Sequence, residues 1–212
     1  MARLAAFAED QWGLLTRRQA QSAGIPRATL DRLVADGTVL ERVAHGIYRL
    51  NGAPVPDHLD LRAAWLQLAP DHGAWEREPS HGVVSHRSAA SVYGIGHLPA
   101  DRHEFTVPSR KQSRRPDVRI HHRAIRTGDW NRLRGLLVTR PSRIAADLLR
   151  EREDPEAIGQ VVADAIRAAY DHPGPFAEAV APHAGKFGLP RHDGIALLRW
   201  LLDLVGDPAA PE

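Results

Sequence analysis

The sequence predicts an α+β protein, with a small amino-terminal domain at residues 1–52 and a larger domain at residues 57–206. Three observations support this: short amphipathic segments crowd the first fifty residues, proline and glycine interrupt the chain at Asn51–Pro56, and β-prone runs precede a series of helical patterns. About 43% of the 212 residues are hydrophobic, enough for both cores without disulfides. Residues 207–212 are expected to be a frayed tail.

The first two predicted helices are short. Leu4–Gln11 places its apolar residues on one side, and Gly13 ends it. Thr16 and Gln19 then have the spacing of a capping box, in which each side chain bonds the backbone amide of the other residue. A second helix is therefore expected to start at Arg17.

A third helix and a hairpin follow directly. Gly24 can close the second helix, and proline suits the first turn of the next, which is predicted over Pro26–Ala35. The runs Thr38–Val43 and Gly46–Leu50 are β-prone and flank a short turn. Two helices joined by a tight turn and followed by a hairpin predict a winged helix-turn-helix.

The larger domain is predicted to hold a small sheet and carboxy-terminal helices. Its strand candidates come first and its longest helix candidates last, as expected for an α+β domain. Helices are expected at Asp57–Leu68, Arg87–Tyr93, Pro141–Arg152, Pro155–Tyr170, Gly174–Ala184 and His192–Val205, and strands at Gly82–Ser85, His103–Val107, Val118–Arg123 and Gly135–Thr139.

A helix-turn-helix points to double-stranded DNA, because a helix with small and basic exposed side chains fits the major groove. Arg27 and Arg32 lie on the predicted outer face of the third helix, where bases are contacted, and Thr29 is short enough to allow close approach there. Backbone phosphates would be held at the start of the second helix and on the wing. The candidates for those contacts are Arg17, Arg18, Arg42, His45 and Arg49.

Positive charge is concentrated in the middle of the chain. The total is nearly balanced, with 28 basic and 26 acidic residues, yet the stretch from Arg102 to Arg143 is strongly basic. Its densest part, Ser109–Pro116, contains Arg110, Lys111, Arg114 and Arg115. This segment is either a solvated hairpin loop or a contact for the DNA backbone or an acidic partner.

Catalytic chemistry is not expected. The chain has no cysteine, and no histidine pattern has zinc-ligand spacing. His121 and His122 would point to opposite faces of a strand, so the histidines are expected to be surface or capping residues and no metal or other cofactor is predicted. A DNA-targeted endonuclease stays as an alternative. Such nucleases require an acidic residue two positions before a lysine, and neither Lys111 nor Lys186 has one there.

Neither export nor membrane insertion is expected. Glu9 and Asp10 fall where a signal peptide needs an apolar core, and Arg199 and Asp203 interrupt the most apolar stretch, Ile195–Val205. The absence of cysteine fits a reducing compartment, so the predicted location is the cytoplasm.

Several segments resemble known sequences. Gly13–Ala20, Gly24–Leu33 and Glu41–Leu50 resemble the amino-terminal domain of AbiEi-family antitoxins. The order of the segments that follow is also similar to that family, and together the resemblance runs roughly from Gly13 to Leu149. These later segments are Ser85–Gly94, His103–Pro108, Val118–His122 and Leu137–Leu148.

The resemblance implies the antitoxin of a type IV toxin-antitoxin pair, which represses its own operon and counteracts a nucleotidyltransferase-like toxin. The expected partners are therefore operator DNA, with inverted repeats, and a cognate toxin. A regulator that responds to a small ligand and has no toxin is a further alternative. Two copies on one operator or one monomer per half-site would both satisfy an inverted repeat, so the oligomeric state stays open.

Overall fold

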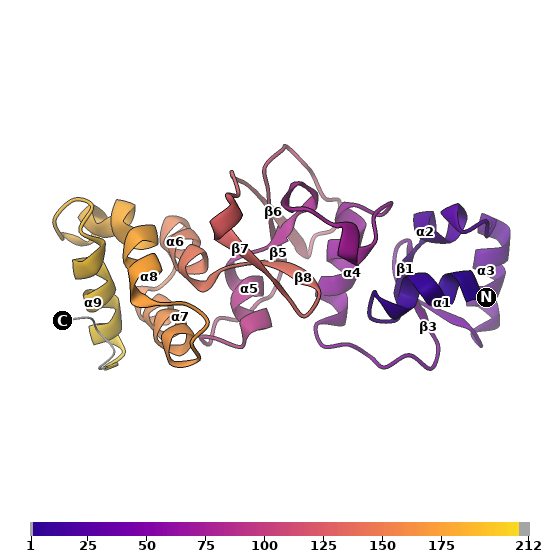
Figure 1. The fold of residues 1–212 in the computed structure, drawn as a ribbon, viewed down its shortest axis with the longest axis horizontal. Helices are drawn as coiled ribbons and strands as arrows, with labels where there is room; N and C mark the ends of the chain where they lie inside the picture. The colour runs from indigo at the N-terminus through magenta and orange to yellow at the C-terminus, as the bar shows by residue number, and fades with distance from the viewer. Residues whose placement is uncertain (1, 208–212) are drawn as a thin grey trace.

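The computed structural model describes residues 2–207 and has the mixed α+β architecture that the sequence predicts. The molecule is elongated (Figure 1): the first helices lie at one end, the last helices at the other, and a mixed sheet lies between them. Residues 208–212 of the predicted tail lie outside the described residues. Asp207 is described, and it accepts a hydrogen bond of 2.6 Å from Arg167.

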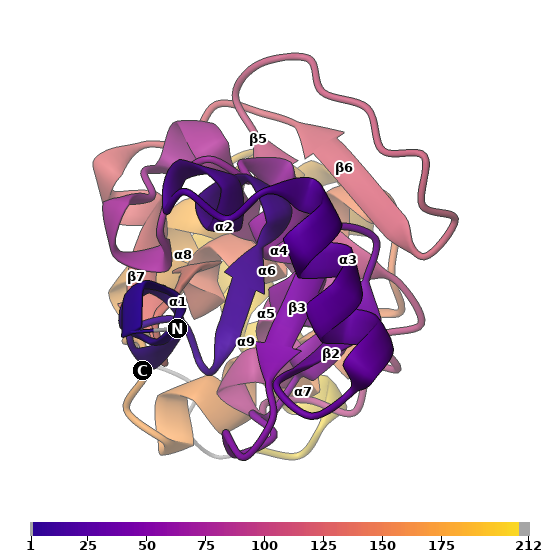
Figure 2. The same cartoon turned by 90° about the vertical axis from the view of Figure 1, so that its right-hand side faces the viewer.

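The amino-terminal region is a three-helix unit with a small antiparallel sheet in the order β1-β3-β2. The three predicted helices and the hairpin are confirmed, while the short first strand was not predicted. Figure 2 views this unit end-on, with α3 beside the β2–β3 hairpin. The elements are α1 (Ala2–Glu9), β1 (Leu14–Thr16), α2 (Arg17–Ser22), α3 (Arg27–Asp36), β2 (Leu40–Ala44) and β3 (Ile47–Leu50).

The central region is a five-stranded mixed sheet in the order β6-β5-β4-β8-β7. The four predicted strands are present, and a fifth, β7, pairs antiparallel with β8 at the edge. Helix α4 precedes the sheet, and α5 follows its first strand. The elements are α4 (Leu59–Leu68), β4 (Val83–Val84), α5 (His86–Tyr93), β5 (His103–Val107), β6 (Val118–His122), β7 (Trp130–Leu133) and β8 (Leu136–Thr139).

Strands β5 and β6 run parallel, from His103 opposite Val118 to Val107 opposite His122. The segment between them is therefore not the hairpin loop that the sequence analysis considered, because a hairpin joins antiparallel strands. Parallel neighbours begin at the same sheet edge, so residues 108–117 must carry the chain back along the length of a strand. We call this segment the crossover loop.

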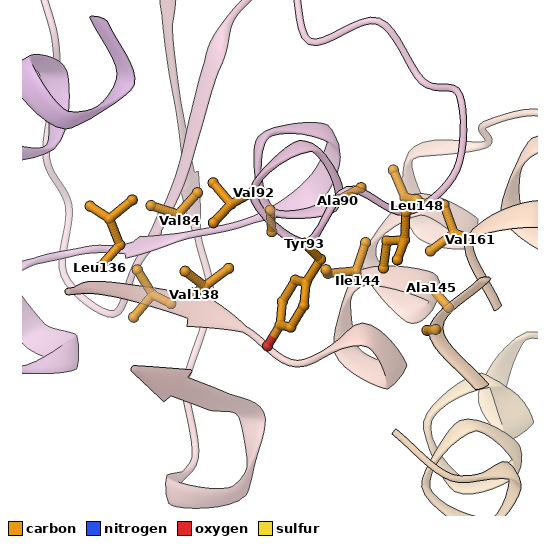
Figure 3. Packing of buried hydrophobic residues seen from close by; sticks show 14 of the residues in the cluster. Val84, Ala90, Val92, Tyr93, Leu136, Val138, Ile144, Ala145, Leu148 and Val161 are labelled. Carbon is orange, nitrogen blue, oxygen red and sulfur yellow. The ribbon is translucent and has the colours of Figure 1, made fainter. Parts of the chain in front are cut away.

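Residues in β4, β8, α5 and α6 pack into one continuous core (Figure 3), in which Val84, Val138, Val92 and Ile144 are fully buried.

The carboxy-terminal region is helical. The predicted helix Gly174–Ala184 is divided between α8 and a 3-10 segment. The elements are α6 (Pro141–Glu151), α7 (Pro155–Arg167), α8 (Pro173–Val180), the 3-10 segment Ala181–Phe187, and α9 (Gly194–Leu204).

The amino-terminal unit is joined to the central region by shared packing. A small cluster around Leu15, Leu30 and Tyr48 belongs to the amino-terminal unit alone. Leu14 and Ile47, however, are buried in the same cluster as α4 and the central sheet. No helix of residues 2–207 is both long enough and apolar enough to cross a lipid bilayer.

Candidate nucleic-acid interface

Helix α3 separates a packing face from an exposed face. Leu30 is fully buried in the small amino-terminal cluster, whereas Arg27 and Arg32 are exposed and Thr29 is half-buried. Arg27 pairs with Asp31 one turn later at 3.6 Å, with both side chains more than half exposed. Such an exposed pair contributes little, so Arg27 can exchange this partner for a DNA base or phosphate at small cost.

The start of α2 is fixed against the hairpin. The predicted capping box is present, since the Thr16 hydroxyl accepts from the amide of Gln19, whose side chain accepts from the amide of Thr16. The guanidinium of Arg17 donates to the Tyr48 hydroxyl at 3.0 and 3.1 Å, and this hydrogen bond raises the pKa of Arg17. The Arg17 amide bonds the carbonyl of Gly46 in the hairpin turn. The start of α2 and the wing are thus joined by hydrogen bonds from both the side chain and the backbone of Arg17.

The predicted wing residues differ in availability. Arg42 lies 3.2 Å from the ring Nδ1 of His45, and both side chains are exposed. Arg49, in contrast, is bonded to the carboxylate of Glu41 at 2.5 Å and to the carbonyl of Ala53, and its side chain is only 13% exposed. Arg42 and His45 can therefore meet DNA without rearrangement, whereas Arg49 must first leave two internal partners.

The crossover loop reaches back to the wing. Gln67 of α4 donates to the carbonyl of His45 at 2.8 Å and accepts from the guanidinium of Arg115 at 3.0 Å, so one side chain connects the wing turn to the loop. Arg115 is also bonded to Asp117, which lowers the pKa of that carboxyl to about 2. Lys111 donates to the carbonyl of Leu68, and burial lowers its pKa.

The four predicted loop cations therefore fall into two pairs. Lys111 and Arg115 hold the loop against α4. Arg110 and Arg114 are exposed and make no ion pair or side-chain hydrogen bond with any residue of 2–207. Only the second pair is free to neutralise phosphates, while the first pair positions it.

A hollow of about 380 Å³ lies where the amino-terminal unit and the crossover loop meet. Arginine side chains and the wing turn line it from one side, and loop residues line it from the other. Its residues are Arg17, Arg18, His45, Gly46, Gln67, Pro70, Gln112, Ser113, Arg114 and Arg115. The structure thus brings together two groups of basic residues that are widely separated in the sequence, in an arrangement suited to an anion such as a backbone phosphate.

Comparison with protein families agrees with this arrangement. Residues 2–51 match the family model described as a transcriptional regulator, AbiEi antitoxin, and residues 82–172 match that of the AbiEi antitoxin C-terminal domain. Together the matches cover about two thirds of the chain. The chain belongs to the AbiEi antitoxin family. No curated protein matches it.

Membership in the AbiEi family gives the chain the general role of an antitoxin and DNA-binding transcriptional regulator. The first match covers the whole helix-turn-helix and the hairpin, from α1 to β3. The second begins just before β4 and ends after α7, so it includes the crossover loop. Both sides of the cationic hollow therefore lie mainly in family-matched segments.

A second cluster of polar side chains lies away from this hollow in the AbiEi-family chain. His86, His121 and Glu151 come together from three elements, and the two imidazole rings stack with their centroids 3.6 Å apart. The expectation of surface or capping histidines is wrong for both, because His86 is 3% and His121 8% exposed and His86 lies inside α5 without capping it. His122 is exposed, in agreement with the predicted alternation along the strand. Residue spacing could not have predicted this cluster, since its members meet only in the folded protein.

Proposed function

We propose that this protein is the autorepressor and antitoxin of its own toxin-antitoxin operon. In this proposal residues 1–52, the first region, contact operator DNA, and residues 57–206, the second region, counteract a nucleotidyltransferase-like toxin. The observation that carries the DNA-binding part is the cationic hollow, where basic side chains of both regions meet beside an exposed helix-turn-helix. The toxin part rests on family membership. In this proposal the chain acts by binding and has no catalytic role.

In the proposed complex, α3 enters the major groove and its exposed arginines contact base edges. Arginine suits this task because its planar guanidinium can bond two acceptors of guanine at once. Arg17 and Arg18 at the start of α2, together with Arg42 and His45, contact the phosphates on either side. These backbone contacts set the position of α3 without selecting a sequence.

The crossover loop extends the phosphate contacts beyond the helix-turn-helix. Arg110 and Arg114 are exposed on it and have no ion-pair partner among residues 2–207, and Gln67 ties the loop to the wing turn. A phosphate bound at the hollow would therefore be held from the second region as well as the first. This makes operator binding a property of the whole chain.

The test is a band-shift titration on the DNA upstream of the gene, with scrambled DNA of equal length as competitor at near-physiological salt. The full chain is compared with Arg27→Ala and Arg32→Ala. Selective binding to the upstream DNA of at least ~100-fold is expected, because specific sites exceed non-specific DNA by factors of this order or more. Each substitution that removes a two-point contact with guanine should cost about 1–3 kcal/mol, or roughly 5- to 150-fold in affinity.

A matched control is Arg191→Ala. Arg191 is exposed like Arg32 but precedes α9 at the opposite end of the molecule (Figure 1). Its loss should leave operator affinity unchanged, since only the total charge changes. Equal weak binding of the wild type to operator and scrambled DNA would contradict autorepression, as would equal losses in Arg191→Ala and Arg32→Ala.

The antitoxin part has its own test. A nucleotidyltransferase-like reading frame beside the gene is expressed alone or together with this chain, and growth is measured. Co-expression should restore growth, and it should still do so with Arg32→Ala, because that position contacts DNA in the proposal. Failure of the wild-type chain to restore growth would refute the antitoxin part and leave the DNA-binding part standing.

A further inference from the structure

The cluster of His86, His121 and Glu151 lies at the junction of three elements in the second region. His86 is the first residue of α5, His121 is in β6, and Glu151 is the last residue of α6. One nitrogen or oxygen from each lies within 4.8 Å of the others. The cluster is remote in sequence from the helix-turn-helix, and the proposed DNA contacts do not use it.

Each of the three side chains is held by a second polar group. His86 Nδ1 lies 2.9 Å from the hydroxyl of Ser85, which leaves Nε2 as its free ring nitrogen. His121 Nε2 lies 3.1 Å from a carboxylate oxygen of Glu104, which leaves Nδ1 free. This free nitrogen is 4.0 Å from Oε1 of Glu151.

The Glu104–His121 contact has the arrangement of outer partners in metalloproteins. There a histidine ligand usually donates its second ring nitrogen to a carboxylate, which orients the ring and makes the metal-facing nitrogen more basic. Glu104 is itself fixed, because its other oxygen accepts from the amide of Arg87 at 3.0 Å. Glu151 is also held, because its Oε2 accepts a hydrogen bond from the guanidinium of Arg119. Every member of the cluster thus has one polar atom held by an outer partner and offers a second to the cluster.

The backbone at His86 is also unusual. Its φ is +53°, in the left-handed region, which only a few per cent of residues other than glycine adopt, histidine more often than most. Such conformations persist only where the surrounding structure enforces them, and they concentrate at functional sites. Here the conformation places a buried imidazole against His121.

We propose that the second region binds one divalent transition-metal ion of the zinc class through His86 Nε2, His121 Nδ1 and the carboxylate of Glu151. Two imidazoles and one carboxylate are the ligand types that zinc prefers, whereas magnesium and calcium prefer oxygen alone. Three protein ligands leave one position of a tetrahedral ion for water or for a group from a partner. This site goes beyond the proposed function and does not depend on it.

Binding requires a small local closure. Bonds of about 2.1 Å place tetrahedral ligand atoms roughly 3.4 Å apart, less than the 4.8 Å within which these atoms now lie. The two rings are nearly parallel, with 14° between their planes, so they must also tilt toward a shared ion. Glu151 can move most easily, because its side chain is 26% exposed and ends a helix. Arg119, which is bonded to Glu151, is 46% exposed, so an ion would approach the cluster from this side.

The experiment titrates Co²⁺, as a spectroscopic substitute for Zn²⁺, into the full chain without an affinity tag. The visible absorption of the ion and the displacement of Co²⁺ by Zn²⁺ are measured. One equivalent should bind with the intense absorption of a four-coordinate site. Glu151→Gln and His121→Gln should abolish this absorption, and Glu104→Gln should weaken binding by about 10- to 100-fold, as loss of an outer partner typically does.

His122→Gln is the matched control, because it removes the neighbouring histidine on the exposed face of the same strand. It should leave the spectrum and the stoichiometry unchanged. Circular dichroism of the metal-free variants checks that they fold, and the partly exposed Glu151→Gln remains decisive if the buried histidine variant does not. Absence of a four-coordinate spectrum in the wild type would overturn the proposal, as would full retention of that spectrum in Glu151→Gln.

Discussion

Replacing Arg110 and Arg114 of the crossover loop should change how DNA binding depends on salt. Arg110 and Arg114 are exposed and make no ion pair within residues 2–207, so their loss breaks no ion pair of the described fold. If each neutralises one phosphate, each contributes about 0.9 to the slope of log K against log salt concentration. The double variant Arg110→Ser/Arg114→Ser should therefore have a slope shallower by about 1.8.

The difference is large enough to measure by fluorescence anisotropy on labelled operator DNA. A fourfold rise in salt, from about 50 to 200 mM, changes the affinity by a factor of four raised to the slope. The wild type should thus lose about 12-fold more affinity over this range than the double variant. The ratio of operator to scrambled-DNA affinity should stay the same, because phosphate contacts do not distinguish sequences.

Two further variants make this result specific. Arg191→Ser removes an exposed arginine at the far end of the molecule and should leave the slope unchanged. Each single loop variant should make the slope shallower by about half as much as the double variant does. An unchanged slope in the double variant would refute the phosphate contact, and a loss of sequence preference would show that the loop contacts bases instead.

Three other variants test the fold that supports the interface. Leu30→Ala removes a fully buried side chain beneath α3 and should lower the free energy of unfolding by about 2–5 kcal/mol, measured by urea denaturation. Gln67→Ala removes two hydrogen bonds that join the wing turn to the loop, and it should speed proteolysis within residues 108–117 while changing the free energy of unfolding by only about 1–2 kcal/mol. His183 is buried, which lowers its pKa from 6.5 to about 4, so below pH 6.5 the unfolded chain binds a proton that the folded chain does not. The free energy of unfolding should therefore decrease as the pH is lowered from 7.5 to 5. His183→Gln should reduce this decrease by about 2 kcal/mol.

The elements that the sequence predicted well are those determined by local contacts. The start of α2 follows from Thr16 and Gln19, three residues apart, whose reciprocal hydrogen bonds are present as predicted. Gly37 closes α3 in the left-handed conformation, so the helix ends at Asp36, one residue after the predicted end at Ala35. Each of these features depends on atoms within one helical turn. A single sequence contains that information directly.

The features that the sequence did not predict depend on contacts between distant segments. Strand β1 has three residues and is a strand only because β3 pairs with it. The parallel pairing of β5 with β6 could not be foreseen either, because a loop of ten residues is compatible with either strand direction, and the sheet neighbours decide between them. The residues His86, His121 and Glu151 do not form a recognisable ligand-spacing pattern in the sequence. They come together only because α5, β6 and α6 place them side by side.

The contacts between the two regions determine how the interface should be studied. The buried side chains of Gln11 and Gln19 bond each other and also bond the backbone at Ala74 and His72 in the second region. The Thr16 hydroxyl, which caps α2, also donates to the carbonyl of Pro70 at 2.5 Å. A fragment of residues 1–52 would leave these groups without their partners.

Such a fragment would also expose Leu14 and Ile47, which are buried against α4 and the central sheet. Unpaired buried polar groups each cost about 1–3 kcal/mol unless water replaces the partner, and the apolar surface adds to this cost. The start of α2 would lose part of its support at the point where Arg17 and Arg18 are proposed to contact phosphate. Weak DNA binding by the fragment would therefore reflect this lost support and the missing crossover loop, so the operator affinity of the full chain is the quantity that tests the interface.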